Sequence, residues 1–170
     1  MRKFWIPTLT LVAAVTMSIS GALAIDKASQ KFIGEAIQGN LAEIEMGKLA
    51  QQKGQSDGVR SFGSQLVSDH RANNKKAMSV AKSVGVNPPN EPTKKQKADY
   101  DRMSKLSGDK FDREFAKMMV EDHKKDIHEF ETEAKKKNDP VAEFANETLP
   151  TLRKHLEMAQ SLASGKSASR

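Results

Sequence analysis

Apolar residues recur at steps of three and four along most of this chain, which is the spacing of one face of an α-helix. Four such stretches follow residue 25, and breaks that contain glycine or proline separate them. The chain after its first two dozen residues therefore indicates helix nearly throughout. The pattern predicts an all-α fold.

The ends of these stretches set the helix boundaries. The first helix is expected from about residue 26 to 53, because Gly54 follows it. The second begins near Ser56 or Asp57 and stops at Gly85 and Pro88-Pro89. The third runs over residues 109–138. Asp139-Pro140, a cap followed by a first-turn proline, starts the fourth, which reaches about residue 163.

A longer connector, residues 85–108, joins the second and third helices. Thr93 with Gln96 resembles a capping box, so a short helix through Leu106 is expected inside the connector. Two tight helical hairpins joined by a long crossover predict a ferritin-like four-helix bundle. A simple up-and-down order with a bulky loop is the alternative.

Pro150 interrupts the pattern of the last helix. A proline inside a helix removes one hydrogen bond and is expected to kink the chain. Alternatively, the helix ends there and a new one starts. Either distortion would fall just over one turn before His155.

The first residues have the features of a signal peptide. Arg2 and Lys3 precede an uncharged, mostly apolar run over residues 4–21, and Ala22-Leu23-Ala24 matches the small-x-small cleavage pattern. An uncleaved membrane anchor is the alternative. The predicted division is a signal peptide at 1–24, a bundle domain at 25–165 and a disordered tail at 166–170. The protein is then periplasmic or otherwise exported.

Composition limits the partners. The formal net charge is +6, and the chain contains no cysteine. Short lysine runs favour either a solvated helix face or weak association with anionic envelope surfaces. Aromatic residues are few and do not interleave with the lysines, so no nucleic-acid surface is indicated. The chain contains no second long apolar run, so no transmembrane segment is expected in the mature protein. The sequence does not indicate an oligomeric state.

One apolar block occurs twice. FGSQLVSDH at residues 62–70 returns as FAKMMVEDH at residues 115–123, and both copies end in Asp-His. On helical wheels His70 and His123 lie within roughly 25° of the centre of their apolar stripes, and His155 within roughly 60°. His128 points outward. Three histidines on three helices therefore face the core, either as metal ligands or as core residues with hydrogen-bond partners.

Counting from the turns places these histidines at one level. His123 lies about 15 residues before the turn between the last two long helices, and His155 about 16 after its start. His70 has a similar height, and Glu43 is the carboxylate expected beside it. Glu43, His70, His123 and His155 form the predicted metal site, whose donors suit Zn, Cu or Fe.

Two aspartates adjoin the predicted ligands. Asp69 and Asp122 are expected to accept the N–H of a histidine on a neighbouring helix and so select its tautomer. The alternative is that each is a carboxylate at the edge of the core, paired with a lysine.

A di-iron carboxylate site is not indicated. Such bundles use Glu-x-x-His motifs, whereas Val67, Val120 and Leu152 stand three residues before the three histidines. The methionines are interpreted as core residues rather than copper ligands.

Four segments together resemble the bacterial exported family called domain of unknown function 4142: NLAEIEMGKLAQQK, LVSDHRANNKK, LSGDKFDREFAKMMVEDHKK and ETLPTLRKHLEMAQ. The resemblance covers nearly the whole mature chain. It implies a ferritin-like bundle in the periplasm or outer envelope, where members often carry an outer-membrane label. It brings no established activity. The family's motif positions match Glu43, His70, His123 and His155, with Asp69 and Asp122 alongside.

Three functions follow from these features. The leading hypothesis is an exported bundle that binds a transition metal in its core. The second is a structural or envelope-stress interaction module, in which a buried His/Asp network sets the helix register without metal. The third is a hydrolase or oxidase with an open metal position.

Overall fold

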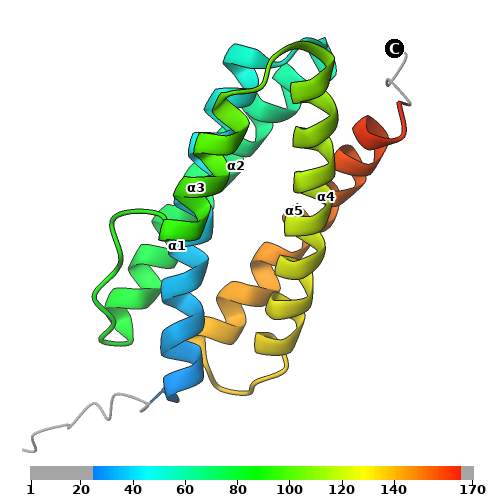
Figure 1. Ribbon diagram of the computed structural model, residues 1–170. Helices are drawn as coiled ribbons and strands as arrows, with labels where there is room; N and C mark the ends of the chain where they lie inside the picture. Colours follow the sequence, from blue (N-terminus) through cyan, green and yellow to red (C-terminus); the bar gives the residue numbers. More distant parts are fainter. Residues whose placement is uncertain (1–24, 166–170) are drawn as a thin grey trace, which may run out of the picture.

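The computed structural model describes residues 25–165, and all regular structure within that range is helical (Figure 1). The predicted signal peptide and tail lie outside the described residues. The predicted all-α fold is confirmed, with five helices and no strand in the described range. They are α1 (Lys27–Lys53), α2 (Asp57–Ser83), α3 (Lys94–Ser104), α4 (Gly108–Glu133) and α5 (Pro140–Ala163).

Side-chain caps begin four of the helices. The Asp26 carboxylate accepts a hydrogen bond from the Ser29 amide at 2.7 Å, and the Ser56 hydroxyl caps α2. The Thr93 and Gln96 capping box begins α3 as predicted, and Asp139 caps α5 ahead of Pro140. These caps satisfy amide donors that have no partner inside the helix. Short polar side chains in the sequence therefore determine where the helices start.

Two pairs of helices make the most extensive contacts, α1 with α2 and α4 with α5, and α2 packs on α5 between the pairs. In Figure 1, α1 and α2 run in opposite directions. The connector and α3 then return to the end of the molecule where α2 began, and α4 starts there. As a result α2 and α4 run in the same direction, and the connector spans the length of the bundle.

Helix α5 continues without a break through Pro150. The alternative of a helix that ends and restarts at this residue is therefore wrong. Packing of α5 on α4 and α2 holds the helix together although Pro150 supplies no amide donor.

The buried core divides into two apolar parts along the helix axes. One contains Phe62, Phe111, Phe115 and Met119, and the other contains residues such as Ile37, Phe130 and Phe144. A layer of buried polar residues separates the two parts. On each of the four long helices, its residues lie in the sequence between those of one apolar part and those of the other. That layer contains Asn40, Glu43, His70, His123 and His155.

None of the described helices is both long and apolar enough to cross a bilayer.

Glycines allow α1 and α2 to approach closely. A Cβ atom on Gly63 would lie 2.6 Å from the carbonyl oxygen of Gly47, and one on Gly47 would lie 2.7 Å from the oxygen of Gly63. Both neighbours are backbone atoms, which cannot rotate away. The distance between the two helices therefore depends on the absence of side chains at both positions.

We expect Gly63→Ala to destabilise the protein by about 2–4 kcal/mol, because α1 and α2 must separate to accept the methyl group. Gly34→Ala is the matched control within α1, where a Cβ atom meets nothing within 4 Å. It should stabilise by up to about 1 kcal/mol through helix propensity. Urea unfolding of both variants measures the difference, and equal effects would contradict the close approach.

Candidate metal centre

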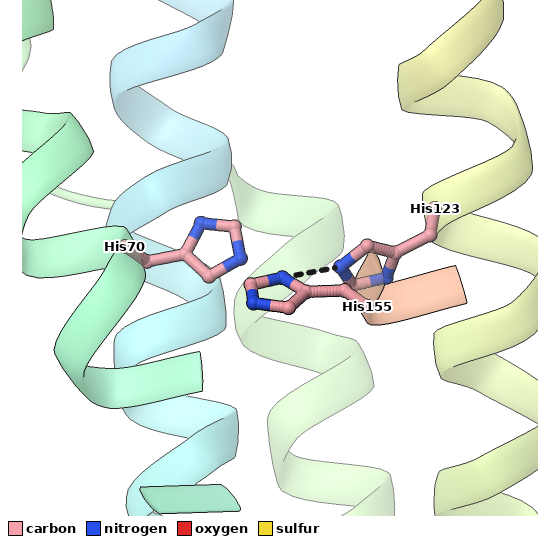
Figure 2. A group of neighbouring side chains, drawn as sticks. All are labelled: His70, His123 and His155. Atoms are coloured by element: carbon pink, nitrogen blue, oxygen red, sulfur yellow. Dashed lines mark hydrogen bonds between the residues drawn. The ribbon is translucent and has the colours of Figure 1, made fainter. Parts of the chain in front are cut away.

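Three histidine side chains meet in the polar layer of the core. His70 comes from α2, His123 from α4 and His155 from α5, and their rings face one another (Figure 2). His70 is 4% exposed and the other two are fully buried. One ring nitrogen from each lies within 4.8 Å of those of the other two. The prediction that three inward histidines share one level is confirmed.

Each imidazole is held by a hydrogen bond at its outer nitrogen. His70 Nδ1 lies 2.8 Å from Asn40 Oδ1, and His123 Nδ1 lies 2.9 Å from the Met119 carbonyl oxygen. His155 Nε2 lies 2.8 Å from Asp69 Oδ2. All three partners are oxygen acceptors, so the outer nitrogen of each ring carries the proton.

These tautomers leave one unprotonated nitrogen on each ring. These nitrogens are His70 Nε2, His123 Nε2 and His155 Nδ1. His70 Nε2 is buried and has no hydrogen-bond partner among the described residues. His123 Nε2 and His155 Nδ1 are 3.3 Å apart, the contact that Figure 2 marks with a dashed line. A hydrogen bond between them needs a second proton on one of the two rings. When both nitrogens are unprotonated, as in these tautomers, they repel each other unless a cation lies between them.

Burial keeps the rings neutral. Burial and, to a smaller extent, the neighbouring His155 lower the pKa of His123 to about 4, although the hydrogen bond to Met119 opposes the change. Burial and the other two histidines lower the pKa of His70 well below its usual value. Burial also lowers the pKa of His155, although its hydrogen bond to Asp69 opposes the change. At neutral pH the lone pairs are therefore free to bind a metal ion.

The Asp69 carboxylate is ionised and partly exposed. Its burial raises the pKa, but hydrogen bonds from Gln65 and His155 outweigh that effect and lower it. Gln65 Nε2 donates to Asp69 Oδ2 at 2.7 Å. The predicted role of Asp69, accepting the N–H of a histidine on another helix, matches this geometry.

Asp122 occupies a different place. It lines a pocket in α4's surroundings, and no hydrogen bond joins it to a histidine within residues 25–165. Glu43 lines the same pocket and is 7% exposed, and its Oε2 has no hydrogen-bond partner in the described chain. The group of ligand atoms within 4.8 Å of one another contains the three histidines and not Glu43.

Two of the groups that hold the rings were not predicted from the sequence. Asn40 accepts from His70 and also from Asn73 Nδ2 at 3.2 Å. Its position three residues after Ile37, on the buried face of α1, is a signal that could have identified it. The Met119 carbonyl could not be found in this way, since any residue four positions before a histidine offers the same backbone group.

An aromatic ring closes one side of the site. The Phe62 ring centroid lies 5.9 Å from that of His155 and 6.5 Å from that of His123. Phe62 belongs to the apolar part of the core that contains Phe115. The rings therefore lie in surroundings of low polarity, where an ion bound to nitrogen would be shielded from water.

A family model described as a domain of unknown function (DUF4142) matches residues 14–162 of the chain. Among curated proteins, none matches it significantly. The fold is similar to the crystal structure of a DUF305 fragment from Deinococcus radiodurans, with a TM-score of 0.72 and 14% sequence identity. That match covers 82% of this chain and 97% of the fragment. At this identity the likeness shows the helical fold alone.

The pocket that contains Glu43 and Asp122 also contains Asp126, whose pKa burial raises to about 7. A raised pKa means that the folded protein retains a proton that the unfolded chain releases above about pH 4. The contribution of Asp126 to stability therefore falls as the pH rises from about 4 to about 7.

Without metal, Asp126→Asn should gain stability relative to the parent protein between pH 4.5 and pH 8, by about 1–2 kcal/mol after allowance for partial exposure. Glu121→Gln, on the exposed face of the same helix, is the control. Urea unfolding at the two pH values tests this. If the difference in unfolding free energy between Asp126→Asn and the parent protein is the same at pH 4.5 and pH 8, Asp126 does not carry the proton.

Proposed function

The chain belongs to the DUF4142 family, a domain of unknown function, and we propose that this protein binds a transition metal ion in its core. His70, His123 and His155 are the proposed ligands. The single observation that carries the proposal is the convergence of three unprotonated ring nitrogens, each oriented by an acceptor behind it.

The distances support an ion of ordinary coordination geometry. A tetrahedral ion with Zn–N bonds of about 2.0–2.1 Å places neighbouring nitrogens about 3.3 Å apart. His123 Nε2 and His155 Nδ1 already have that separation, 3.3 Å. The other nitrogen pairs, at up to 4.8 Å, need to approach by no more than about 1.5 Å.

The donor set favours Zn²⁺, Cu²⁺ or Fe²⁺. Imidazole nitrogen suits these borderline ions, whereas Mg²⁺ and Ca²⁺ prefer oxygen. Water supplies the remaining coordination in this proposal. In this proposal Glu43 and Asp122 line the neighbouring pocket and are not bonded to the ion.

The acceptors behind the rings strengthen the proposal. Metal-binding histidines usually donate their second N–H to a carboxylate or carbonyl, which increases the basicity of the ligating nitrogen. Here Asp69, the Met119 carbonyl and Asn40 fill that role on three separate helices.

We also propose the finer fold and location. The shared direction of α2 and α4, with a connector that spans the bundle, supports a ferritin-like four-helix bundle to which α3 is an addition. The predicted signal peptide supports export to the periplasm, where the lysine runs would favour weak contact with anionic surfaces.

A structural role without metal is the second candidate, and the existing hydrogen bonds favour it. Asn40, Met119 and Asp69 already satisfy one nitrogen of each ring. Such a network can set the register of helices. It predicts that metal ions leave the melting temperature unchanged, and that His123→Leu keeps or raises the stability.

Protein purified without a histidine tag should bind one Zn²⁺ or Co²⁺, and His123→Leu should weaken binding at least 100-fold because one of three ligands is lost. His128→Leu is the control, since His128 is exposed. Isothermal titration and the visible spectrum of tetrahedral Co²⁺ measure binding. At 100 times the dissociation constant, the ion should stabilise the parent protein by about 2.7 kcal/mol. No thermal shift on adding Zn²⁺ or Cu²⁺ would contradict the proposal.

Asp69→Ala should weaken Zn²⁺ binding by about 10–100-fold, because His155 loses the acceptor that orients it and selects its tautomer. Ser68→Ala, at the adjacent exposed position of α2, should bind like the parent protein. Competition with a chelator of known affinity provides the measurement. Equal affinity in the two variants would show that the hydrogen bond does not support the site.

A further inference from the structure

A pocket of about 480 Å³ lies between α1, α3 and α4, and His70 lines it but Asp69 does not. Its wall includes carboxylates from two helices, Glu43 on α1 and Asp122 with Asp126 on α4. The two aspartates are four residues apart, so they project from the same face of α4. The three-histidine site uses none of these carboxylates as a ligand.

Glu43 is the most unusual of the three groups. Its side chain is 7% exposed, and its Oε2 atom is buried and has no hydrogen-bond partner among residues 25–165. A buried polar atom without a partner is costly, and a buried charge more so. Beside it on α1, Asn40 Nδ2 also lacks a partner, and Asn40 lines the same pocket. The pocket wall therefore contains unsatisfied polar atoms.

Lys95 and Lys125 line the same pocket and attract Asp122, and Lys125 also attracts Asp126, but no lysine among the described residues forms an ion pair with Glu43, Asp122 or Asp126. The Lys95 ammonium lies 2.9 Å from Asp99, and the Lys125 ammonium lies 3.1 Å from Glu129. In the part of the chain that the structure describes, no hydrogen bond or ion pair joins Asp122 or Asp126 to another residue. The positive charges near the pocket are thus paired with acids outside the group.

The electrostatics are consistent with a missing cation. Burial raises the pKa of Glu43 well above its usual value, and the charges of Asp122 and Asp126 raise it further. Carboxylates that share a site in this way either retain protons or bind a cation that offsets their repulsion.

We propose that Glu43, Asp122 and Asp126 form a second cation site, which holds a hydrated divalent metal ion of the oxygen-preferring kind in part through its water ligands, since their oxygens do not form a close group of ligand atoms like that of the three histidines. Three carboxylates are the donors that Mn²⁺, Mg²⁺ and Ca²⁺ favour. The pocket is large enough for the ion to keep several water ligands. These waters would also reach the unpartnered oxygen of Glu43. The site does not depend on metal at the histidines.

The two sites differ in chemistry. One offers three nitrogens in apolar surroundings, and the other offers oxygens and space for water. An ion that prefers nitrogen should select the first site, and an ion that prefers oxygen should select the second. This difference allows the two to be measured separately.

Mn²⁺ binding, followed by its electron paramagnetic resonance signal and by water proton relaxation, tests the second site. The probe is Mn²⁺ alone, added to full-length protein that carries one equivalent of Zn²⁺ and, separately, to His123→Leu. Both should bind one Mn²⁺. Glu43→Gln with Asp126→Asn should weaken Mn²⁺ binding at least 10-fold and leave Zn²⁺ binding within about threefold.

Glu121→Gln with Glu157→Gln removes the same charge from exposed positions and is the matched control. It should bind Mn²⁺ like the parent protein. Asp122→Asn gives a second test with one neutral substitution, and circular dichroism checks that each variant is folded. Equal Mn²⁺ binding by all variants would show surface binding only and overturn the inference, as would no binding by the parent at about 1 mM Mn²⁺. Loss of Zn²⁺ binding alone would count against the histidine site and not against this one.

Discussion

The structure depends on a layer of imidazoles whose protons all point outward. Asn40, the Met119 carbonyl and Asp69 each accept one N–H, and one unprotonated nitrogen on each ring is left inside the bundle. Without a ligand this arrangement is unfavourable, because unprotonated nitrogens repel and His70 Nε2 has no hydrogen-bond partner within residues 25–165. The metal ion that we propose here would convert the same arrangement into a stabilising one.

The position of the layer explains how the helices maintain it. Apolar residues above and below it pack separately, around Phe62 and Phe115 at one end and Phe130 and Phe144 at the other. A shift of one helix by a residue would remove a histidine from the layer and place a polar ring among apolar side chains. The glycine contact between α1 and α2 limits such shifts at the backbone level. Packing and the polar layer therefore favour the same register.

The side of the layer that faces the pocket has a different character. Glu43 belongs to the layer by height, yet it turns to the pocket that Asp122 and Asp126 also line. Counting residues along helices gives the height of a side chain and the side it faces, and it located the three histidines correctly. Such counting cannot tell whether the Glu43 carboxylate reaches the histidines or the neighbouring pocket, because the histidines and the pocket both lie next to the same face of α1.

The sequence by itself determined the helices, their caps and the three inward histidines, since these follow from local spacing and from short polar side chains next to the backbone. It also indicated Asp69 as an acceptor. Only the tertiary structure decided that Asn40 and the Met119 carbonyl hold the other two rings, and that Asp122 faces a pocket instead of a histidine. Those outcomes depend on the rotation of each helix against its neighbours, which arises from packing between residues far apart in the chain.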